Sequence, residues 1–270
     1  MCKKELRKIL KSKRALAIPV TYLILFVSLV AIISVTYSFA VAKISSKGAL
    51  LKVSVAKQNM QVLDNAVHSV AWSFGASEVV YMDDCGGVFQ TEPTAKSLVI
   101  KFTDDVVFNS SIGKAFYELE SSGFDYYGFF VRGDYGAIIN QSAHTMTQLC
   151  FSTGNKAKEL TLCYRPSATS ASIGTSNGKP LNLIRIYIIN LNSSQNLMLR
   201  EKFYLTVTSL NVTTTTQQYD FNVSVSSLAL KAVFDGTLST VWLPISSNSE
   251  GAVVNLEIVA CNVKIQKVEV

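Results

Sequence analysis

Residues 15–42 read ALAIPVTYLILFVSLVAIISVTYSFAVA, and this stretch decides the architecture of the chain. It contains 28 residues without one charged side chain, whereas a helix needs about 20 apolar residues to cross a bilayer. We therefore predict a transmembrane helix here. Seven basic residues precede it within residues 1–15, and only scattered lysines follow it. Because positively charged flanks stay on the cytoplasmic side, we expect a cytoplasmic N-terminus and a body outside the cell.

The charge of the chain is concentrated in its first residues. The 270 residues include 25 basic and 19 acidic side chains, a net charge of +6, and residues 1–15 alone hold seven of the basic and one of the acidic ones. The rest of the chain is therefore neutral. Nucleic-acid binding requires clustered Lys and Arg on a folded surface, so we predict no nucleic-acid partner.

The junction between the basic residues and the apolar stretch carries a second signal. An ordinary secretory signal has an apolar core of about 7–15 residues before its cleavage site, and residues 15–42 are too long for that. The junction instead reads Lys13-Arg14-Ala15 followed by Leu16-Ala17-Ile18-Pro19-Val20. It resembles the class III signal peptides of archaeal type IV pilins and archaellins, in which two basic residues and a Gly or Ala precede the cut and an apolar helix follows.

This resemblance implies a processing step and an assembled state. In that family a membrane-embedded aspartic peptidase, the prepilin peptidase, cuts at the cytoplasmic face, and the mature helix then packs into a filament with identical or related pilin subunits. Carried over, Lys13 and Arg14 are the basic pair, Ala15 ends the leader and Leu16 begins the mature chain. Pro19 then takes the fourth mature position, where many of these pilins have proline at the third. An uncleaved signal anchor, which needs only positive charge before an apolar stretch, is the alternative.

A one-sided apolar pattern follows the membrane segment. No proline lies between Pro19 and Pro93, so we predict one helix that starts at Leu16, with Pro19 in its first turn, and ends before Gly75. Apolar spacings of three and four predict that its second half docks on the rest of the chain, and a membrane-proximal coiled coil is the alternative. The stripe consists of Ala56, Met60, Leu63, Val67, Val70 and Phe74.

Beyond the helix the chain is rich in β-branched and aromatic residues, separated by polar turns. We predict an α+β fold with a basic leader (1–15), a transmembrane and assembly helix (16–75) and an extracellular antiparallel all-β sandwich (76–270). A short helix is expected near residues 113–121 and a surface loop at residues 167–178. The expected strands are residues 97–103, 126–132, 136–140, 181–190, 203–210, 219–228 and 254–270.

Five asparagines in the predicted extracellular part match the N-glycosylation pattern N-x-Ser/Thr. We predict surface glycans on them, because such sugars are bulky and solubilising. The acceptors are Asn109, Asn140, Asn192, Asn211 and Asn222.

The cysteines are expected to form disulfides. Cys2 leaves with the leader, and an even number outside the cell favours bridges. If residues 146–154 and 159–166 form a hairpin, Cys150 and Cys163 lie opposite each other, with Cβ atoms about 4.5–5.5 Å apart. This leaves Cys85 to pair with Cys261. The alternative is four buried thiols.

No pattern in the sequence indicates an enzyme, a cofactor or a metal site. The chain has only two histidines, His68 and His144, so no His cluster for zinc can form. The motif Gly174-Thr175-Ser176-Asn177-Gly178 matches G-x-S-x-G, but a nucleophile elbow requires a following helix and a later His. We therefore expect a structural subunit of a pilus-like filament, major, minor or adhesive. The alternative is a membrane-anchored β-domain that binds a glycan or solute, with residues 124–130 as its aromatic surface.

Overall fold

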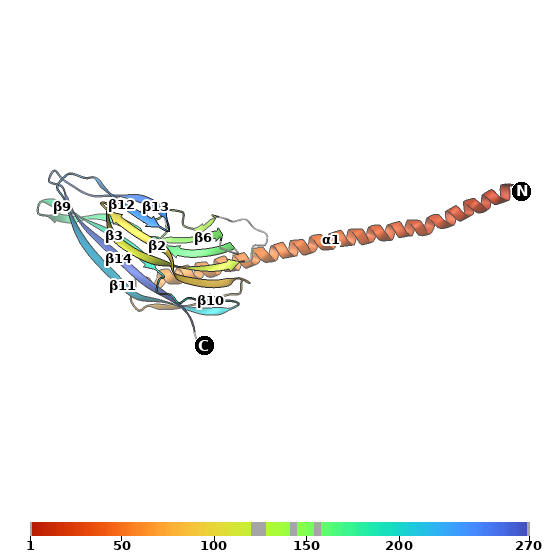
Figure 1. Cartoon of the computed structure of the whole chain (residues 1–270), viewed down its shortest axis with the longest axis horizontal. Coiled ribbons are helices and arrows are strands. Elements are labelled where there is room, and N and C mark those ends of the chain that lie inside the picture. The colour runs from red at the N-terminus through yellow and green to blue at the C-terminus, as the bar shows by residue number, and fades with distance from the viewer. Residues whose placement is uncertain (1, 120–127, 141–144, 154–157, 269–270) are drawn as a thin grey trace. The chain divides into compact units, whose positions relative to one another are not determined.

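The computed structural model describes residues 2–119, 128–140, 145–153 and 158–268, with side chains from residue 19 onward except at 153. The chain divides into two compact units, Met1–Leu50 and Leu51–Val270. The first unit is helical, and the second combines the end of the same helix with two β-sheets (Figure 1). This is the predicted α+β fold.

Helix α1 (Cys2–Val70) differs from the prediction at both ends. It begins before Leu16, and Pro19 lies inside it and not in its first turn. It ends four residues before Phe74: a turn closes with hydrogen bonds from Ala71 N to Val67 O and from Ser73 N to Val70 O. Gly75 then adopts a φ of 74°, and its backbone N–H donates to Ser209 O (2.9 Å). The helix ends early because this segment joins the edge of a sheet.

The first sheet has six strands in the order β1-β11-β14-β9-β8-β5. Most neighbours are antiparallel, but β14 pairs with β9 and β5 pairs with β8 in parallel. The expectation of purely antiparallel sheets is therefore wrong at these two pairs. The strands are β1 (Ser77–Met82), β5 (Ile139–Asn140), β8 (Ser167–Ser176), β9 (Lys179–Asn190), β11 (Phe203–Phe221) and β14 (Ala252–Lys267).

The second sheet has eight strands in the order β13-β12-β2-β3-β7-β6-β4, with β10 beside β2. All its described pairs are antiparallel. The strands are β2 (Val88–Phe102), β3 (Asp105–Leu119), β4 (Phe130–Arg132), β6 (Thr147–Thr153), β7 (Lys158–Tyr164), β10 (Met198–Leu199), β12 (Ser227–Phe234) and β13 (Thr237–Pro244).

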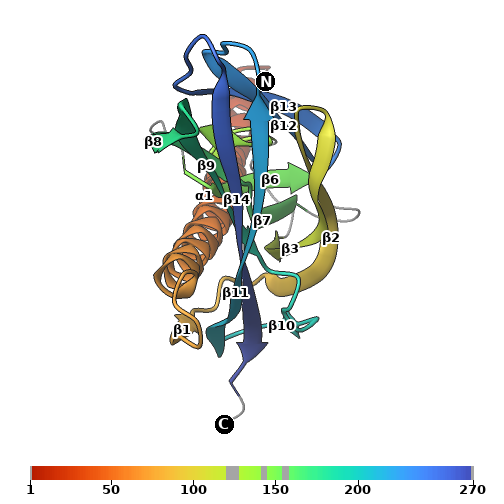
Figure 2. The ribbon, with the colours of Figure 1, turned by 90° about the vertical axis from the view of Figure 1, so that its left-hand side faces the viewer.

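Two apolar cores hold the second unit together. One lies between the two sheets, where alternate residues of β2 and β12 meet alternate residues of β9 and β14, such as Ile100, Leu230, Ile186 and Leu256. This is the packing of a β-sandwich. The other core surrounds the end of α1 and takes residues from both sheets. Figure 2 shows this part of the helix beside the strands.

Three local predictions are wrong, and strand pairing explains the first. Residues 113–119 belong to β3, which pairs here with β2 on one side and β7 on the other, so they form a strand and not a helix. Residues 167–176 form β8 and not a loop, because a sequence of Ser, Thr and Ala pairs along the apolar strand β9. The expected strand 219–228 is divided between the end of β11 and the start of β12.

Candidate functional site

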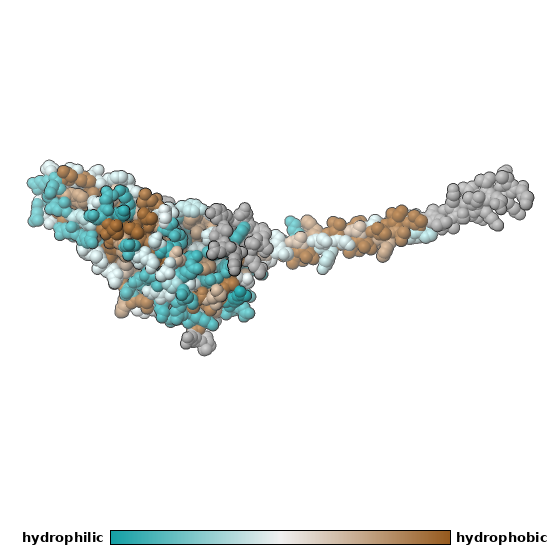
Figure 3. All heavy atoms as spheres, in the orientation of Figure 1, coloured by the Kyte–Doolittle hydropathy of each residue, from teal (hydrophilic) through white to brown (hydrophobic). Residues whose placement is uncertain are grey.

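The most unusual surface of the chain is the apolar part of α1. A helix segment that starts at Pro19 is long and apolar enough to cross a membrane, and its most apolar window has no buried residue. The apolar side chains point outward all round the helix: Phe26, Phe39 and Tyr37 are 64%, 64% and 71% exposed. Figure 3 shows this segment as a nearly continuous apolar surface. Such a surface requires lipid or other protein around it.

Three hydroxyls in this segment bond to the helix itself. The hydroxyls of Ser28, Ser34 and Thr36 donate to the backbone carbonyls of Leu25, Val30 and Ile32 at 2.8–2.9 Å. A hydroxyl that bonds to its own helix has its donor satisfied in an apolar environment. These three side chains are therefore compatible with lipid or with packed helices.

Pro19 removes a helical hydrogen bond at the predicted cleavage site, the Ala15–Leu16 peptide bond. In an α-helix the N–H of each residue donates to the carbonyl four residues earlier, so the partner of the Ala15 carbonyl is residue 19. Proline has no N–H, and its ring crowds that same carbonyl. The helical backbone runs through residues 13–19. The carbonyl of the predicted Ala15–Leu16 cleavage bond therefore lacks its helical hydrogen bond.

The apolar stripe on the second half of α1 docks on the sandwich, as predicted. Its first five members are at most 4% exposed and belong to the core around the helix. Phe74 is 77% exposed, so its inclusion was wrong, because it lies beyond the helix end. Those five are Ala56, Met60, Leu63, Val67 and Val70.

A buried carboxylate, which the sequence analysis missed, lies within this stripe. Asp64 is 0% exposed, and its oxygens accept hydrogen bonds from Tyr164 Oη (2.9 Å), Thr147 Oγ1 (2.8 Å) and the Arg132 guanidinium. His68 Nε2 lies 3.5 Å from the same carboxylate. Burial, together with the Asp64 charge, holds the pKa of Tyr164 well above its ordinary value.

The Asp64 group is a clamp and not a catalytic triad. His68 Nε2 contacts both Thr147 Oγ1 (2.9 Å) and the carboxylate, so the His does not stand between a carboxylate and a nucleophile as a triad requires. Asp64 ties α1 to three strands, β4, β6 and β7. The spacing of Asp64, four residues after Met60 and three before Val67, places it on the apolar face, and this was the available signal.

A second polar contact ties the helix to the loop after β1 and to strand β3. The Asn59 side chain is 5% exposed, donates to the Asp83 carbonyl (2.8 Å) and accepts from the Asp83 N–H (3.1 Å). Its Nδ2 also donates to Tyr117 Oη (3.0 Å). Asn59 and Asp64 therefore set the rotation and the height of the helix within the sandwich.

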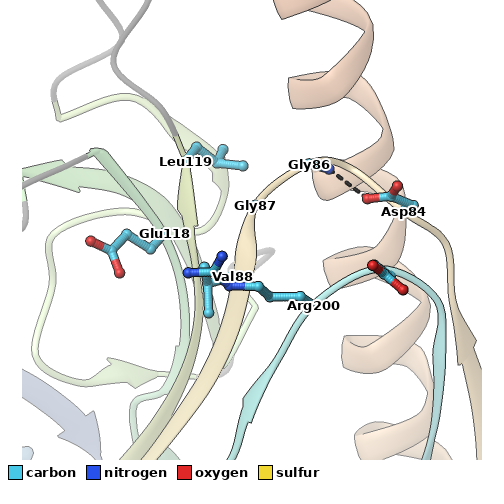
Figure 4. A pocket seen from close by; sticks show the side chains of 8 residues that line it. Asp84, Gly86, Gly87, Val88, Glu118, Leu119 and Arg200 are labelled. Atoms are coloured by element: carbon cyan, nitrogen blue, oxygen red, sulfur yellow. Dashed lines mark hydrogen bonds between the residues drawn. The ribbon is translucent and has the colours of Figure 1, made fainter.

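One open pocket lies beside the loop that joins β1 to β2, with a volume of about 400 Å³. Its lining combines Asp84, Glu118 and Glu201 with Arg200. Figure 4 shows that Asp84 turns back to accept the Gly86 N–H, at 2.7 Å. Glu118 is held by Gln90 (2.9 Å). Asp84 and Glu118 therefore already have hydrogen-bond donors, and the described residues contain no cluster of three His, Cys, Asp or Glu that could hold a metal.

The predicted aromatic surface is only partly described. Residues 124–127 lie outside the described residues. Phe129 is 49% exposed, with Lys57 Nζ 5.7 Å from its ring centre. Phe130 packs edge-on against Tyr135 (4.5 Å between ring centres). The described part does not form an aromatic groove.

The four cysteines of the second unit are free, so neither predicted disulfide is formed. The assumed hairpin register is wrong by two residues, because Cys150 pairs with Thr161 and Cys163 pairs with Gln148. Cys85 and Cys261 are buried in the core around the helix. Burial raises the pKa of the Cys163 thiol to about 11. The alternative of unbridged thiols is the one that the structure describes.

The predicted glycan acceptors differ in exposure. Asn109, Asn211 and Asn222 are exposed, and Asn140 and Asn192 are half-buried. The hydroxyl residue of the Asn192 motif, Ser194, is itself buried at 8% exposure. Ser142, the hydroxyl residue after Asn140, lies outside the described residues.

Comparison with known proteins adds no assignment: no family model, no curated protein and no solved structure matches this chain.

Proposed function

We propose that the chain is a subunit of a type IV pilus-like surface filament. Residues 1–15 are its leader, a prepilin peptidase removes them, and the helix that remains assembles with copies of itself or with related subunits. The precursor lies in the membrane with a cytoplasmic N-terminus, and the β-sandwich is its extracellular face. The protein acts by packing and not by catalysis.

The exposed apolar part of α1 is the observation that carries the proposal. A simple membrane anchor needs about 20 apolar residues, and the uncharged stretch here has 28. In a filament these side chains exchange lipid for neighbouring helices. Because lipid is as apolar as leucine, close packing and not the exclusion of water then decides the stability of the assembly.

The polar contacts of Asn59 and Asp64 support the same proposal. A filament subunit must present its globular part at a fixed angle and height on the assembly helix. Apolar packing alone tolerates small rotations, whereas a buried carboxylate with three hydrogen-bond donors does not. These contacts give the second half of α1 one register within the sandwich.

Mass spectrometry of the N-terminal peptide, on protein recovered from the surface of cells that make it, tests the proposal. We expect the chain to start at Leu16 or within one residue of it. The double variant Lys13→Ala/Arg14→Ala is expected to keep its leader. Lys3→Ala/Lys4→Ala removes the same charge away from the junction, so it is a matched control and should be processed normally.

The other outcome leads to the second candidate. If the native chain keeps residues 1–15, α1 is a permanent anchor. If both double variants are processed alike, Lys13 and Arg14 do not direct the cleavage and the prepilin-type leader is refuted. The sandwich then works as a tethered domain, and the pocket at Asp84 and Arg200 is the first place to look for a bound glycan or solute. Filaments that contain the protein would contradict this second candidate.

A further inference from the structure

One side of the sandwich has an unpaired strand edge. Strand β1 pairs with β11 only over Phe203–Thr208, whereas β14 pairs with β11 as far as Phe221. No described strand lies beside Asn211–Phe221 on the side away from β14. These residues span about 36 Å at roughly 3.3 Å per residue. Every second one therefore offers an N–H and a carbonyl without a strand partner.

A second unpaired edge lies near the first. Strand β7 pairs with β3 only over Ala115–Leu119, so among the described strands Asp105–Ile112 pair with β2 alone, and the Ser111 carbonyl accepts from Asn190 Nδ2 (2.8 Å). The ring of Tyr219 on β11 lies 4.8 Å from that of Phe102 at the β2–β3 turn, and Figure 2 shows these elements at the same flank. We call the two unpaired edges, residues 105–112 and 211–221, the seam.

The middle of the β11 edge lacks the usual protection of a strand edge. Natural edges carry lysine, proline or a covering segment, because an open edge pairs with other chains. Residues 213–218 read TTTTQQ, without a charge or a proline, and all six are exposed. Threonine has a high β-propensity and forms good cross-strand pairs. An unmodified seam would therefore be an association site.

The three exposed glycan acceptors lie on the seam or directly after it. Asn109 is on the open part of β3, Asn211 begins the open part of β11 and Asn222 follows its last residue. Asn211 Oδ1 accepts from Asn262 Nδ2 (2.7 Å), and Asn222 Oδ1 accepts from Lys179 Nζ (2.7 Å). Each amide thus uses its oxygen and leaves Nδ2, the atom that carries an N-linked sugar, available.

We propose that N-linked oligosaccharides on Asn109, Asn211 and Asn222 cover the seam and keep it from pairing with a second copy. In each transfer the Asn Nδ2 attacks the first sugar of a lipid-phosphate-linked oligosaccharide. An N–C bond forms, the bond between that sugar and the phosphate breaks, the lipid phosphate leaves and the amide loses one proton. This proposal does not depend on leader cleavage or on filament assembly.

The distribution of the acceptors favours sugars over a second copy as the occupant. Three acceptors that are far apart in the sequence meet on a flank where each sheet has an open edge among the described strands. A second copy paired along β11 would have to place its own strand between Asn211 and Asn222. Branched sugars at both ends of the edge leave no room for that strand.

The first test is glycopeptide mass spectrometry of the full-length protein from cells that make it. We expect an oligosaccharide on the peptides that contain Asn109, Asn211 and Asn222. Recovery of the Asn211 and Asn222 peptides without sugar would overturn the proposal.

The second test measures whether the sugars block pairing. Thr215→Cys places one thiol in the middle of the open edge, and Thr240→Cys on β13 is the control, since Thr240 is also exposed. We expect mild oxidation to cross-link Thr215→Cys chains at least fivefold more in the Asn109→Gln/Asn211→Gln/Asn222→Gln background than with the acceptors intact. Thr240→Cys should not respond. Equal cross-linking of Thr215→Cys in both backgrounds contradicts the proposal, and strong cross-linking with intact acceptors shows that a second copy occupies the edge.

Discussion

Replacement of Asp64 by alanine tests whether the buried carboxylate holds α1 in the sandwich. The substitution removes the acceptor for Tyr164 Oη, Thr147 Oγ1 and the Arg132 guanidinium at once. Tyr164 is buried at 1% exposure, so its hydroxyl is left without this partner and without water. Alanine supports the helix itself, because it has the best helix propensity. The expected loss is therefore tertiary.

The magnitude follows from how each partner can respond. A buried hydroxyl without a partner costs about 1–3 kcal/mol, which applies to Tyr164. Thr147 keeps its contact with His68, and the Arg132 side chain is 41% exposed and can return to water. Breaking a fully buried ion pair costs about 3–5 kcal/mol, and the exposure of Arg132 lowers that figure. We expect Asp64→Ala to lower the free energy of unfolding by about 2–4 kcal/mol.

Urea unfolding of the full chain in detergent measures this loss. Tryptophan fluorescence reports on the second unit alone, because the chain has two tryptophans, Trp72 and Trp242. Asp104→Asn is the control: that carboxylate pairs with Lys231 at the surface, with its side chain 80% exposed, and asparagine tolerates the φ of 72° at this position. It should leave the unfolding curve almost unchanged.

A double-mutant cycle decides whether the reasoning is right. Tyr164→Phe should be destabilising in the native chain and nearly neutral or favourable after Asp64→Ala, because its hydroxyl has then already lost its acceptor. Additive effects of the two substitutions, or a loss below about 1 kcal/mol for Asp64→Ala, would refute the clamp.

Three further predictions concern the leader bond, the thiols and alkaline pH. Pro19→Ala restores the helical hydrogen bond of the Ala15 carbonyl, so we expect slower leader removal in a pulse-chase experiment. Ala17→Ser changes no backbone hydrogen bond, so it should be processed at the native rate. Non-reducing alkylation in denaturant should label all four thiols, Cys85, Cys150, Cys163 and Cys261. In the native chain Cys163 should resist alkylation at pH 8. An intact mass that shows a disulfide would contradict this. The raised pKa values of Tyr164 and Cys163 mean that the fold favours their neutral forms. The stability that they contribute is therefore present below their unfolded pKa values and is lost as the pH rises through about 9–11. An unchanged melting temperature between pH 8 and 11 would exclude this.

Local pattern predicted the parts of the fold that depend on one segment at a time. The uncharged stretch and the 3,4 spacing from Ala56 to Val70 identified α1 and its docking face, because both follow from helix geometry alone. Alternation identified strands β9 and β14. The parallel pairing of these two strands depends instead on residues about 70 positions apart, which no local pattern records.

The errors arose where tertiary contacts override local preference. A short helix was expected near residues 113–121, but a Cβ at Gly113 would lie 2.5 Å from the Leu191 backbone, so glycine is there for close packing within a strand. The predicted pairing of Cys150 with Cys163 is wrong because the hairpin turn lies one residue earlier in the chain than expected, and this moves the register of β6 against β7 by two residues. Asp64 was overlooked as a core position because a charged residue in an apolar stripe is normally taken as a break in that stripe.

The place of β14 in the first sheet affects the order in which the sandwich can form. It follows every other described strand along the chain, yet it lies in the interior of the sheet, between β11 and β9. During synthesis the earlier strands of that sheet therefore wait for a central partner, and the longest pairing in the sheet forms last. Such non-local closure is slow. Loss of β14 would leave β11 and β9 with no common neighbour, so truncation there should be more damaging than truncation of an edge strand.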